Sequence, residues 1–178
     1  MAISILATVP AVASTFLHMS SKELITEADA LIQGRVVELS SFWTESGRLS
    51  ATEVMIEVEE TLLGEAPATV TVRTFGGEVG DIKVEAHGFP RFERGERVLL
   101  YLTTDPDDGT VRVLGYQQGQ FRIVTRNDGV TLAVPMVDEG ARFLTATGKA
   151  APVLRSLEIS AFKASVAKIA AGVGRETK

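Results

Sequence analysis

The chain contains no cysteine, and this absence excludes three kinds of site at once. Disulfide bridges, thiolate zinc sites and thiol nucleophiles all need a cysteine side chain. The composition also argues against the small secreted eukaryotic modules, which disulfides usually stabilise. A chain of 178 residues does not need such cross-links, because it buries roughly 70% of its unfolded surface on folding. We therefore expect one domain with an ordinary hydrophobic core.

Histidine and positive charge are also scarce. The chain has two histidines, His18 and His87, and neither has the HExxH or HxH spacing that metal sites use. We therefore expect no metal ligand and no cofactor. The net charge of -5 argues against a nucleic-acid partner, because such proteins carry an excess of Lys and Arg that neutralises phosphates. No apolar run approaches the ~20 residues of a membrane span, so we expect none.

Two motifs are similar to ligand-binding loops but lack the residues that would complete them. The stretch 105–109, "DPDDG", could begin a calcium loop, yet Thr110 and Tyr116 occupy the positions of the EF-hand glycine and glutamate. The glycine-rich stretch 75–81, "FGGEVGD", runs into a strand pattern and carries carboxylates that repel phosphate. We interpret the first as a hairpin turn and the second as a flexible loop between strands. No GxSxG motif is present, and we predict no catalytic residue.

The N-terminal residues are almost entirely apolar or small. The "AVA" at 11–13 fits the small-x-small pattern that precedes signal-peptide cleavage, although the positively charged n-region is missing. We interpret residues 1–13 as the remnant of a signal peptide that is cleaved after Ala13, and the alternative is a short apolar strand. We therefore expect the protein outside the cytoplasm, in the periplasm or secreted.

The middle of the chain alternates apolar and polar residues with a period of two, which is typical of half-buried strands. Val54, Ile56 and Val58 share one face of such a segment, and glutamates take the other. The stretch 97–102, "RVLLYL", is apolar on both faces and predicts a strand that is buried on both sides. Turn-forming residues separate these segments. The pattern predicts a mainly β domain at 14–135, an antiparallel Greek-key or OB-like barrel of six to eight strands.

Two helices are expected beside the strands. The stretch 20–31, "SSKELITEADAL", predicts a short N-terminal helix with a serine cap. Residues 136–153 have no clear period and predict a loop or arm, whereas residues 154–174 predict an amphipathic C-terminal helix. The apolar stripe of this helix consists of Ile159, Phe162, Val166, Ile169 and Val173.

The stripe of the C-terminal helix must be covered, because so short a helix is marginal alone in water. It docks either on the barrel of its own chain or on a partner. We expect the barrel, and hence a monomer rather than a homodimer, because intramolecular contact avoids the entropy cost of association.

The order of several motifs resembles that of a family of uncharacterised bacterial exported β-barrel proteins. The motifs are "ADALIQGRVVEL", "IEVEETLLG", "GFPRFERGERVLLYL" and "GYQQGQFRIV", and they cover roughly residues 15–135. This resemblance implies a signal peptide, a helix and strands in that order, and it implies no established activity. More distantly, the order is similar to the OB-like barrel of metalloproteinase-inhibitor and netrin-type modules. Their zinc-binding N-terminal cysteine has no counterpart in this chain.

The stretch 88–102, "GFPRFERGERVLLYL", places five charged residues directly before a buried strand. We interpret the charges mainly as a solvated turn with local ion pairs, which contribute only about 0–1 kcal/mol each. The alternative is a recognition loop formed with "YQQGQ", because arginine and aromatic side chains often anchor interfaces. The candidate ligand- or partner-binding residues are Phe89, Arg91, Phe92, Tyr116, Gln117 and Gln118.

The sequence favours an exported, non-enzymatic binding or interaction module for an unknown protein or small-molecule ligand. Two alternatives stay open: a hydrolase outside the cytoplasm with an unrecognised site, and a protease inhibitor that acts through its loops. A deep pocket with convergent polar groups would favour an enzyme. A shallow apolar patch rimmed by charge would favour a binding module.

The interpretation of residues 1–13 is testable in the native host. When the gene includes the upstream codons, we expect the mature protein to begin at Ser14 or within about two residues of it, because the small-residue site precedes that position. N-terminal sequencing of the purified protein measures this directly. An intact Met1 would show that the segment is not a signal peptide.

Overall fold

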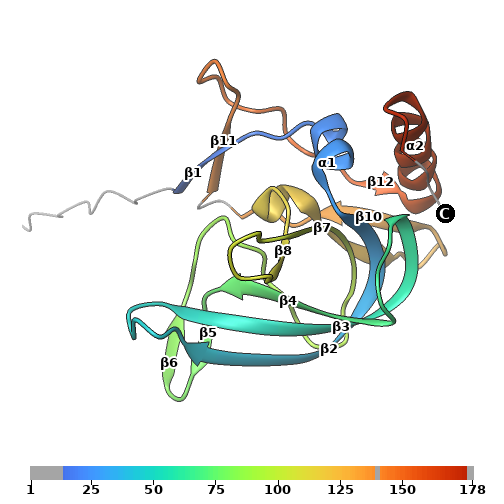
Figure 1. Ribbon diagram of the computed structural model, residues 1–178. Coiled ribbons are helices and arrows are strands. Elements are labelled where there is room, and N and C mark those ends of the chain that lie inside the picture. Colours follow the sequence, from blue (N-terminus) through green and yellow to red (C-terminus); the bar gives the residue numbers. More distant parts are fainter. Residues whose placement is uncertain (1–13, 139–140, 176–178) are drawn as a thin grey trace, which may run out of the picture.

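The computed structural model describes residues 14–138 and 141–175 and is mainly β, as predicted (Figure 1). The segment 1–13, which the sequence predicts to be a signal-peptide remnant, lies outside the described residues. No helix in the described ranges is long and apolar enough to cross a membrane.

One antiparallel sheet of eight strands forms the body of the protein, with the strand order β12-β10-β9-β7-β2-β3-β4 and β8 paired to β7. Two small sheets flank it: β1 pairs with β11 in parallel, and β5 with β6 in antiparallel orientation. The strands of the main sheet are β2 (Ala30–Trp43), β3 (Ser50–Gly64), β4 (Thr69–Phe75), β7 (Arg97–Thr104), β8 (Val111–Val113), β9 (Gln120–Thr125), β10 (Thr131–Pro135) and β12 (Leu157–Glu158). Those of the small sheets are β1 (Ser14–Leu17), β11 (Ala141–Leu144), β5 (Gly77–Val79) and β6 (Ile82–Val84).

Strand β7 is the branching point of the main sheet. One of its edges pairs with β2 along Arg97–Leu102. The other edge is divided, because Val98–Leu100 pair with β9 whereas Leu102–Thr104 pair with β8. The chain crosses between these two partners through a 3-10 helix, η1 (Tyr116–Gly119). Because of this division, β9 and β10 lie on the side of the helices, whereas β8 lies beside the free edge of β4.

The prediction of a closed barrel is wrong. The sheet curls until β4 lies alongside β8, but in the described part of the chain no backbone ladder joins these two strands. Side chains bridge the gap instead, and a guanidinium nitrogen of Arg73 on β4 donates a hydrogen bond of 3.3 Å to the Thr110 hydroxyl beside β8. Strand β8 has only three residues, so it offers little backbone for a closing ladder.

The main sheet separates two buried clusters, and β7 contributes to both. Val98, Leu100 and Leu102 point into the cluster enclosed by the curl of the sheet, together with residues of β2, β3 and β4. Leu99 and Tyr101 point into the cluster on the opposite face, which the helices cover. The predicted burial of this strand on both faces is therefore confirmed. Burial also raises the pKa of the Tyr101 phenol.

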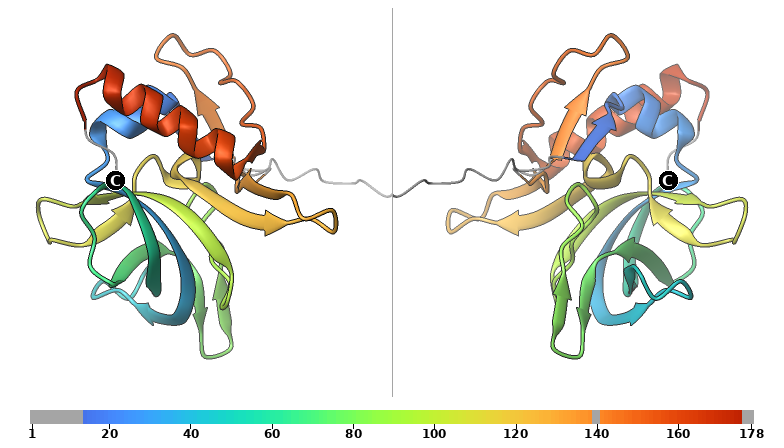
Figure 2. Two further views of the ribbon diagram at one scale, coloured as in Figure 1. Left: turned by 90° about the vertical axis from the view of Figure 1, so that its right-hand side faces the viewer. Right: turned by 90° about the vertical axis from the view of Figure 1, so that its left-hand side faces the viewer.

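Two helices cover the outer face of the sheet side by side (Figure 2). Helix α1 (Ser21–Glu27) begins with a capping box between Ser20 and Glu23. Helix α2 (Ile159–Gly172) buries Phe162, Val166 and Ala170 in the outer cluster. The remaining members of the predicted stripe, Ile159, Ile169 and Val173, are partly buried against the same cluster. The stripe therefore packs on the sheet of its own chain.

The C-terminal region differs from the expectation in two places. Residues 136–153, expected as a loop or arm, contain β11, which pairs with β1 from the other end of the chain. The expected helix at 154–174 begins only at Ile159, because Leu157–Glu158 extend the main sheet as β12. Both strands are short and pair with distant segments, so the local sequence carries no period that would reveal them.

The burial of β7 on both faces predicts how substitutions in and before this strand change the free energy of unfolding. Leu100 is fully buried, so we expect Leu100→Ala to lower the free energy of unfolding by about 2–5 kcal/mol. Arg94 lies in the exposed turn before the strand, and Arg94→Ala serves as the control with an expected loss under about 1 kcal/mol. Urea titration measures both values. Equal losses for the two variants would contradict the assignment of the core.

Candidate functional site

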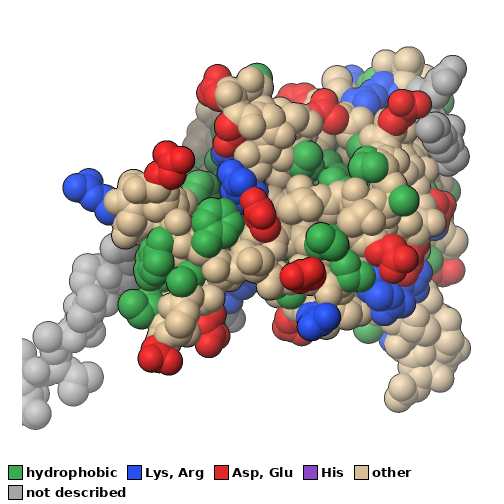
Figure 3. All heavy atoms as spheres, turned by 60° about the horizontal axis from the view of Figure 1, so that its bottom comes forward, with side chains coloured by type: hydrophobic (Ala, Val, Ile, Leu, Met, Phe, Trp, Pro, Cys, Tyr) green, Lys and Arg blue, Asp and Glu red, His purple; other side chains and the backbone are tan. Residues whose placement is uncertain are grey.

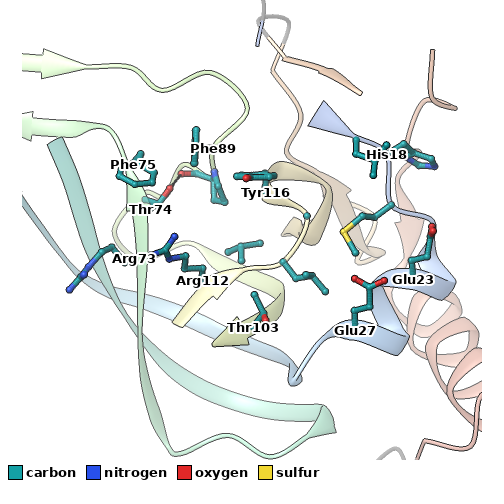
Figure 4. A pocket seen from close by; sticks show the side chains of 16 residues that line it. His18, Glu23, Glu27, Arg73, Thr74, Phe75, Phe89, Thr103, Arg112 and Tyr116 are labelled. Atoms are coloured by element: carbon teal, nitrogen blue, oxygen red, sulfur yellow. Dashed lines mark hydrogen bonds between the residues drawn. The ribbon is translucent and has the colours of Figure 1, made fainter. Parts of the chain in front are cut away.

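A cavity of about 480 Å³ lies where the curled edge of the sheet faces α1 (Figure 4). Its volume is in the range of small-molecule sites in proteins. Residues 73–75 at the end of β4 and residues 112–114 at the end of β8 line one side. Residues 17–19 and the carboxylates Glu23 and Glu27 of α1 line the other. The cavity is therefore a direct consequence of the gap between β4 and β8.

Three aromatic rings form one wall of the cavity, and we call Phe75, Phe89 and Tyr116 the aromatic wall. Phe89 is central, with ring centroids 5.2 Å from Phe75 and 5.1 Å from Tyr116, both in edge-to-face geometry. Such pairs add about 0.5–1.5 kcal/mol beyond the area that they bury. The wall is thus a preformed apolar surface, and Tyr116 on it is 42% exposed.

The N-terminal strap, residues 14–20, closes the cavity beside the aromatic wall. Phe16 of the strap lies 4.6 Å from Tyr116 and 6.0 Å from Phe89 between ring centroids. It also stacks on Phe143 of β11 at 5.6 Å. The aromatic residues that the sequence indicated as a recognition surface are therefore already in contact with the protein's own N-terminal strand.

Three of the four Arg and Glu side chains that line the cavity have partners within the protein. The Arg73 guanidinium binds Glu53 at 2.7 Å, and the Arg112 guanidinium binds Asp105 at 3.0 Å. On the opposite side, hydrogen bonds from Ser20 lower the pKa of Glu23, whose carboxylate completes the cap of α1. The exposed carboxylate of Glu27 is the fourth group, so both arginines of the lining are paired and one carboxylate stays open to solvent.

Three buried glutamines hold the irregular segments around η1. Gln118 accepts hydrogen bonds from the backbone of Met19 and the ring of His18, and it donates to the carbonyl of Leu17. Gln120 donates to the carbonyl of Arg91 at 2.6 Å. A primary amide has both donors and acceptors, so it replaces the backbone partners that a strand would have supplied. The division of β7 between β8 and β9 creates the need for these side chains.

Gln117 and Asp138 connect η1 to the loop that carries Phe89 and Arg91. The Gln117 amide donates to the carbonyl of Phe89 at 3.0 Å and to a carboxylate oxygen of Asp138 at 2.8 Å. Asp138 also binds the Arg91 guanidinium at 2.9 Å. Burial raises the pKa of Asp138, but the hydrogen bonds from Gln117 and Gly88 and the charge of Arg91 outweigh it and place the pKa below its usual value.

The structure brings most of the candidate binding residues together but gives them different roles. Phe89 and Tyr116 line the cavity, whereas Gln117 and Gln118 are 2% exposed and serve as internal hydrogen-bonding groups. Arg91 is occupied by Asp138. Phe92 is separate from them, because its side chain packs against the inner cluster of the sheet.

The charge cluster before β7 is structural, but its predicted local ion pairs are wrong. Arg97 binds Glu59 of β3, with a closest distance of 2.6 Å, and this contact lowers the pKa of Glu59. Glu96 binds Arg122 of β9 at 2.8 Å, and burial raises the pKa of Glu96. The charges thus fasten the neighbouring strands β3 and β9 to the start of β7.

The stretch 105–109 is a turn, as predicted. Asp105 and Asp108 lie in it between β7 and β8, where both bind Arg112. The glycine-rich stretch 75–81 differs from the expected loop, because it contains the end of β4 and the strand β5 of the β5–β6 hairpin. Among the described residues, no group of three or more His, Asp or Glu side chains is arranged to hold a metal ion.

Several residues of the site could not be found by sequence reasoning. Phe16 precedes the first element that the sequence predicts, Phe143 lies in the segment expected to be a loop or arm, and Asp138 belongs to no motif. Only long-range packing places them beside η1. A signal was present for Gln120, because "YQQGQ" holds three glutamines in five residues of a strongly apolar region.

On the face seen in Figure 3, hydrophobic side chains are interspersed with charged side chains of both signs. Comparisons of the chain with protein-family models, with curated proteins and with solved structures gave no match. The geometry of the cavity is therefore the basis for inferring a function.

Proposed function

We propose that the protein is an exported, non-enzymatic binding module whose cavity takes an uncharged, apolar ligand. The observation that carries this proposal is the aromatic wall, which faces a cavity whose two arginines, Arg73 and Arg112, are already paired within the protein. Export is supported by the apolar residues 1–13 and their small-residue end.

The polar groups of the cavity support binding rather than catalysis. The Thr74 hydroxyl donates to the carbonyl of Pro90 at 2.9 Å, and Nδ1 of His18 lies 3.0 Å from the Gln118 amide oxygen. A catalytic site would instead direct a nucleophile, a base and an orienting group at one point in free space. Here the polar groups are used to hold loops, and the apolar rings are left for the ligand.

The pairing of the rim also indicates which ligands fit. An anionic ligand would have to compete with Asp105 for Arg112 or with Glu53 for Arg73. An apolar ligand requires no such exchange, and it gains about 25 cal/mol for each Å² of apolar surface that it buries. The coverage of the α2 stripe by its own sheet supports a monomer as the binding unit.

A dye titration tests the proposal. N-Phenyl-1-naphthylamine is an uncharged apolar dye whose fluorescence rises when it leaves water, and we expect saturable binding to the wild type. Thr103 lines the cavity, so Thr103→Trp should fill it and weaken binding about tenfold or more. The matched control is Thr125→Trp, at an exposed position on β9 that does not line the cavity, and it should bind as the wild type does.

Thermal melts of both variants establish that they are folded before binding is compared. A wild type that does not bind the dye contradicts the proposal. Equal affinities of the wild type and the two variants would place the dye elsewhere on the protein and contradict it as well.

A further inference from the structure

The strap separates three cavities of the described structure. His18 lines the cavity of the aromatic wall, a second one of about 650 Å³ beside β10 and β11, and a third one of about 390 Å³ over the outer cluster. Met19 lines the first and the third. The second and third cavities share residues 152–154. The strap is therefore a partition, and its displacement would join the three spaces into one groove.

Few hydrogen bonds hold the strap on the rest of the protein, and most of them involve β11 and Gln118. Four residues pair with β11 in a parallel ladder, and the amide of His18 donates to the carbonyl of Leu144 at 2.7 Å. The Gln118 side chain provides further hydrogen bonds, to Leu17, His18 and Met19, and Ser20 at the end of the strap caps α1. Parallel pairing is slightly weaker per residue than antiparallel pairing.

The side chains of the strap contribute little to the hydrophobic core. Neither Phe16 nor Leu17 belongs to the two buried clusters, and Leu17 is 66% exposed. Met19 only packs against the edge of the outer cluster. Segments with few buried apolar contacts open at a lower free energy than the global unfolding of a protein. Apart from the ring of Phe16, which contacts Phe89, Tyr116 and Phe143, the strap has the features of such a segment.

The backbone next to the strap is held in an unfavourable conformation. Tyr116 has φ 57°, and it is the one non-glycine residue of the described ranges with a positive φ. Its ring contacts Phe16 at 4.6 Å. Gly88 is required on the other side, because a Cβ atom at that position would lie 2.0 Å from the Phe16 ring. Strain of this kind persists where surrounding contacts impose it and gathers at binding and switch regions.

We propose that the strap is a gate, and that the ligand it admits is an elongated apolar molecule that extends from the aromatic wall past His18. This inference rests on the proposed function, because it names the shape of the ligand of the same cavity. A compact ligand fits beside the aromatic wall with the strap in place. An elongated ligand needs the strap to leave β11.

A reversible cross-link tests the gate in the full chain. Thr15 and Arg142 are paired in the parallel ladder and both are exposed, so the double variant Thr15→Cys/Arg142→Cys places two thiols within reach of a disulfide. The natural chain has no cysteine, so no other disulfide competes. The matched control is Thr125→Cys/Thr131→Cys, which cross-links the β9–β10 hairpin away from the strap.

Each variant is studied oxidised and reduced with two probes. N-Phenyl-1-naphthylamine is the compact probe, and methyl parinarate, an uncharged ester with a long polyene chain, is the elongated one. We expect oxidation of the strap variant to slow the association of methyl parinarate about tenfold or more, because the open state is no longer populated. The compact dye should bind the oxidised and the reduced strap variant with equal affinity. In the control variant, oxidation should change the binding of neither probe.

The possible outcomes separate the two proposals. Equal association of methyl parinarate with the oxidised and reduced strap variant, with the compact dye still bound, overturns the gate and leaves the binding function intact. Loss of both probes on oxidation overturns the inference that a compact ligand fits in the cavity while the strap is in place. Failure of the wild type to bind either probe overturns the proposed function and the gate together.

Discussion

The fold depends on the burial of β7 between two hydrophobic clusters. Its alternate side chains enter the inner and the outer cluster, as do side chains of β2 and β3, so β7 at the centre of the sheet connects the curled sheet with the helical layer. The partners of β7 follow from this position: β2 takes one edge along most of the strand, while β8 and β9 divide the other. That division creates the gap where the sheet stays open, and the cavity occupies the end of the gap.

The gap has a second consequence, because the chain between β8 and β9 has no strand partner of its own. The amides of Gln117, Gln118 and Gln120 supply the missing hydrogen bonds, and in doing so they hold the strap and the loop around Phe89. Buried polar groups are costly unless they are paired, so these side chains specify one arrangement of the loops. The same amides thus fix the shape of the cavity and the position of its gate.

The mainly β, antiparallel class of the fold and the burial of β7 were predictable, because period-two alternation and the run 97–102 are local signals. The open sheet was not, since closure depends on whether β4 and β8 pair at a distance. The cavity was half predictable: Phe89 and Tyr116 stand in motifs, whereas Phe16 arrives through a parallel pairing with β11 from the far end of the chain. The distant ion pairs of Glu96 and Arg97 were missed for the same reason.

The proposed binding requires that the strap opens while the sheet and its two hydrophobic clusters stay folded. Native-state hydrogen exchange tests this most directly, because it measures the free energy of opening at each amide. The amides of Leu99, Leu100 and Tyr101 should exchange only at the free energy of global unfolding, because both faces of β7 are buried. The amide of His18, bonded to Leu144, should exchange at a much lower free energy through local opening of the strap. Equal protection of His18 and β7 would show that the strap opens only when the whole protein unfolds, and would contradict this requirement.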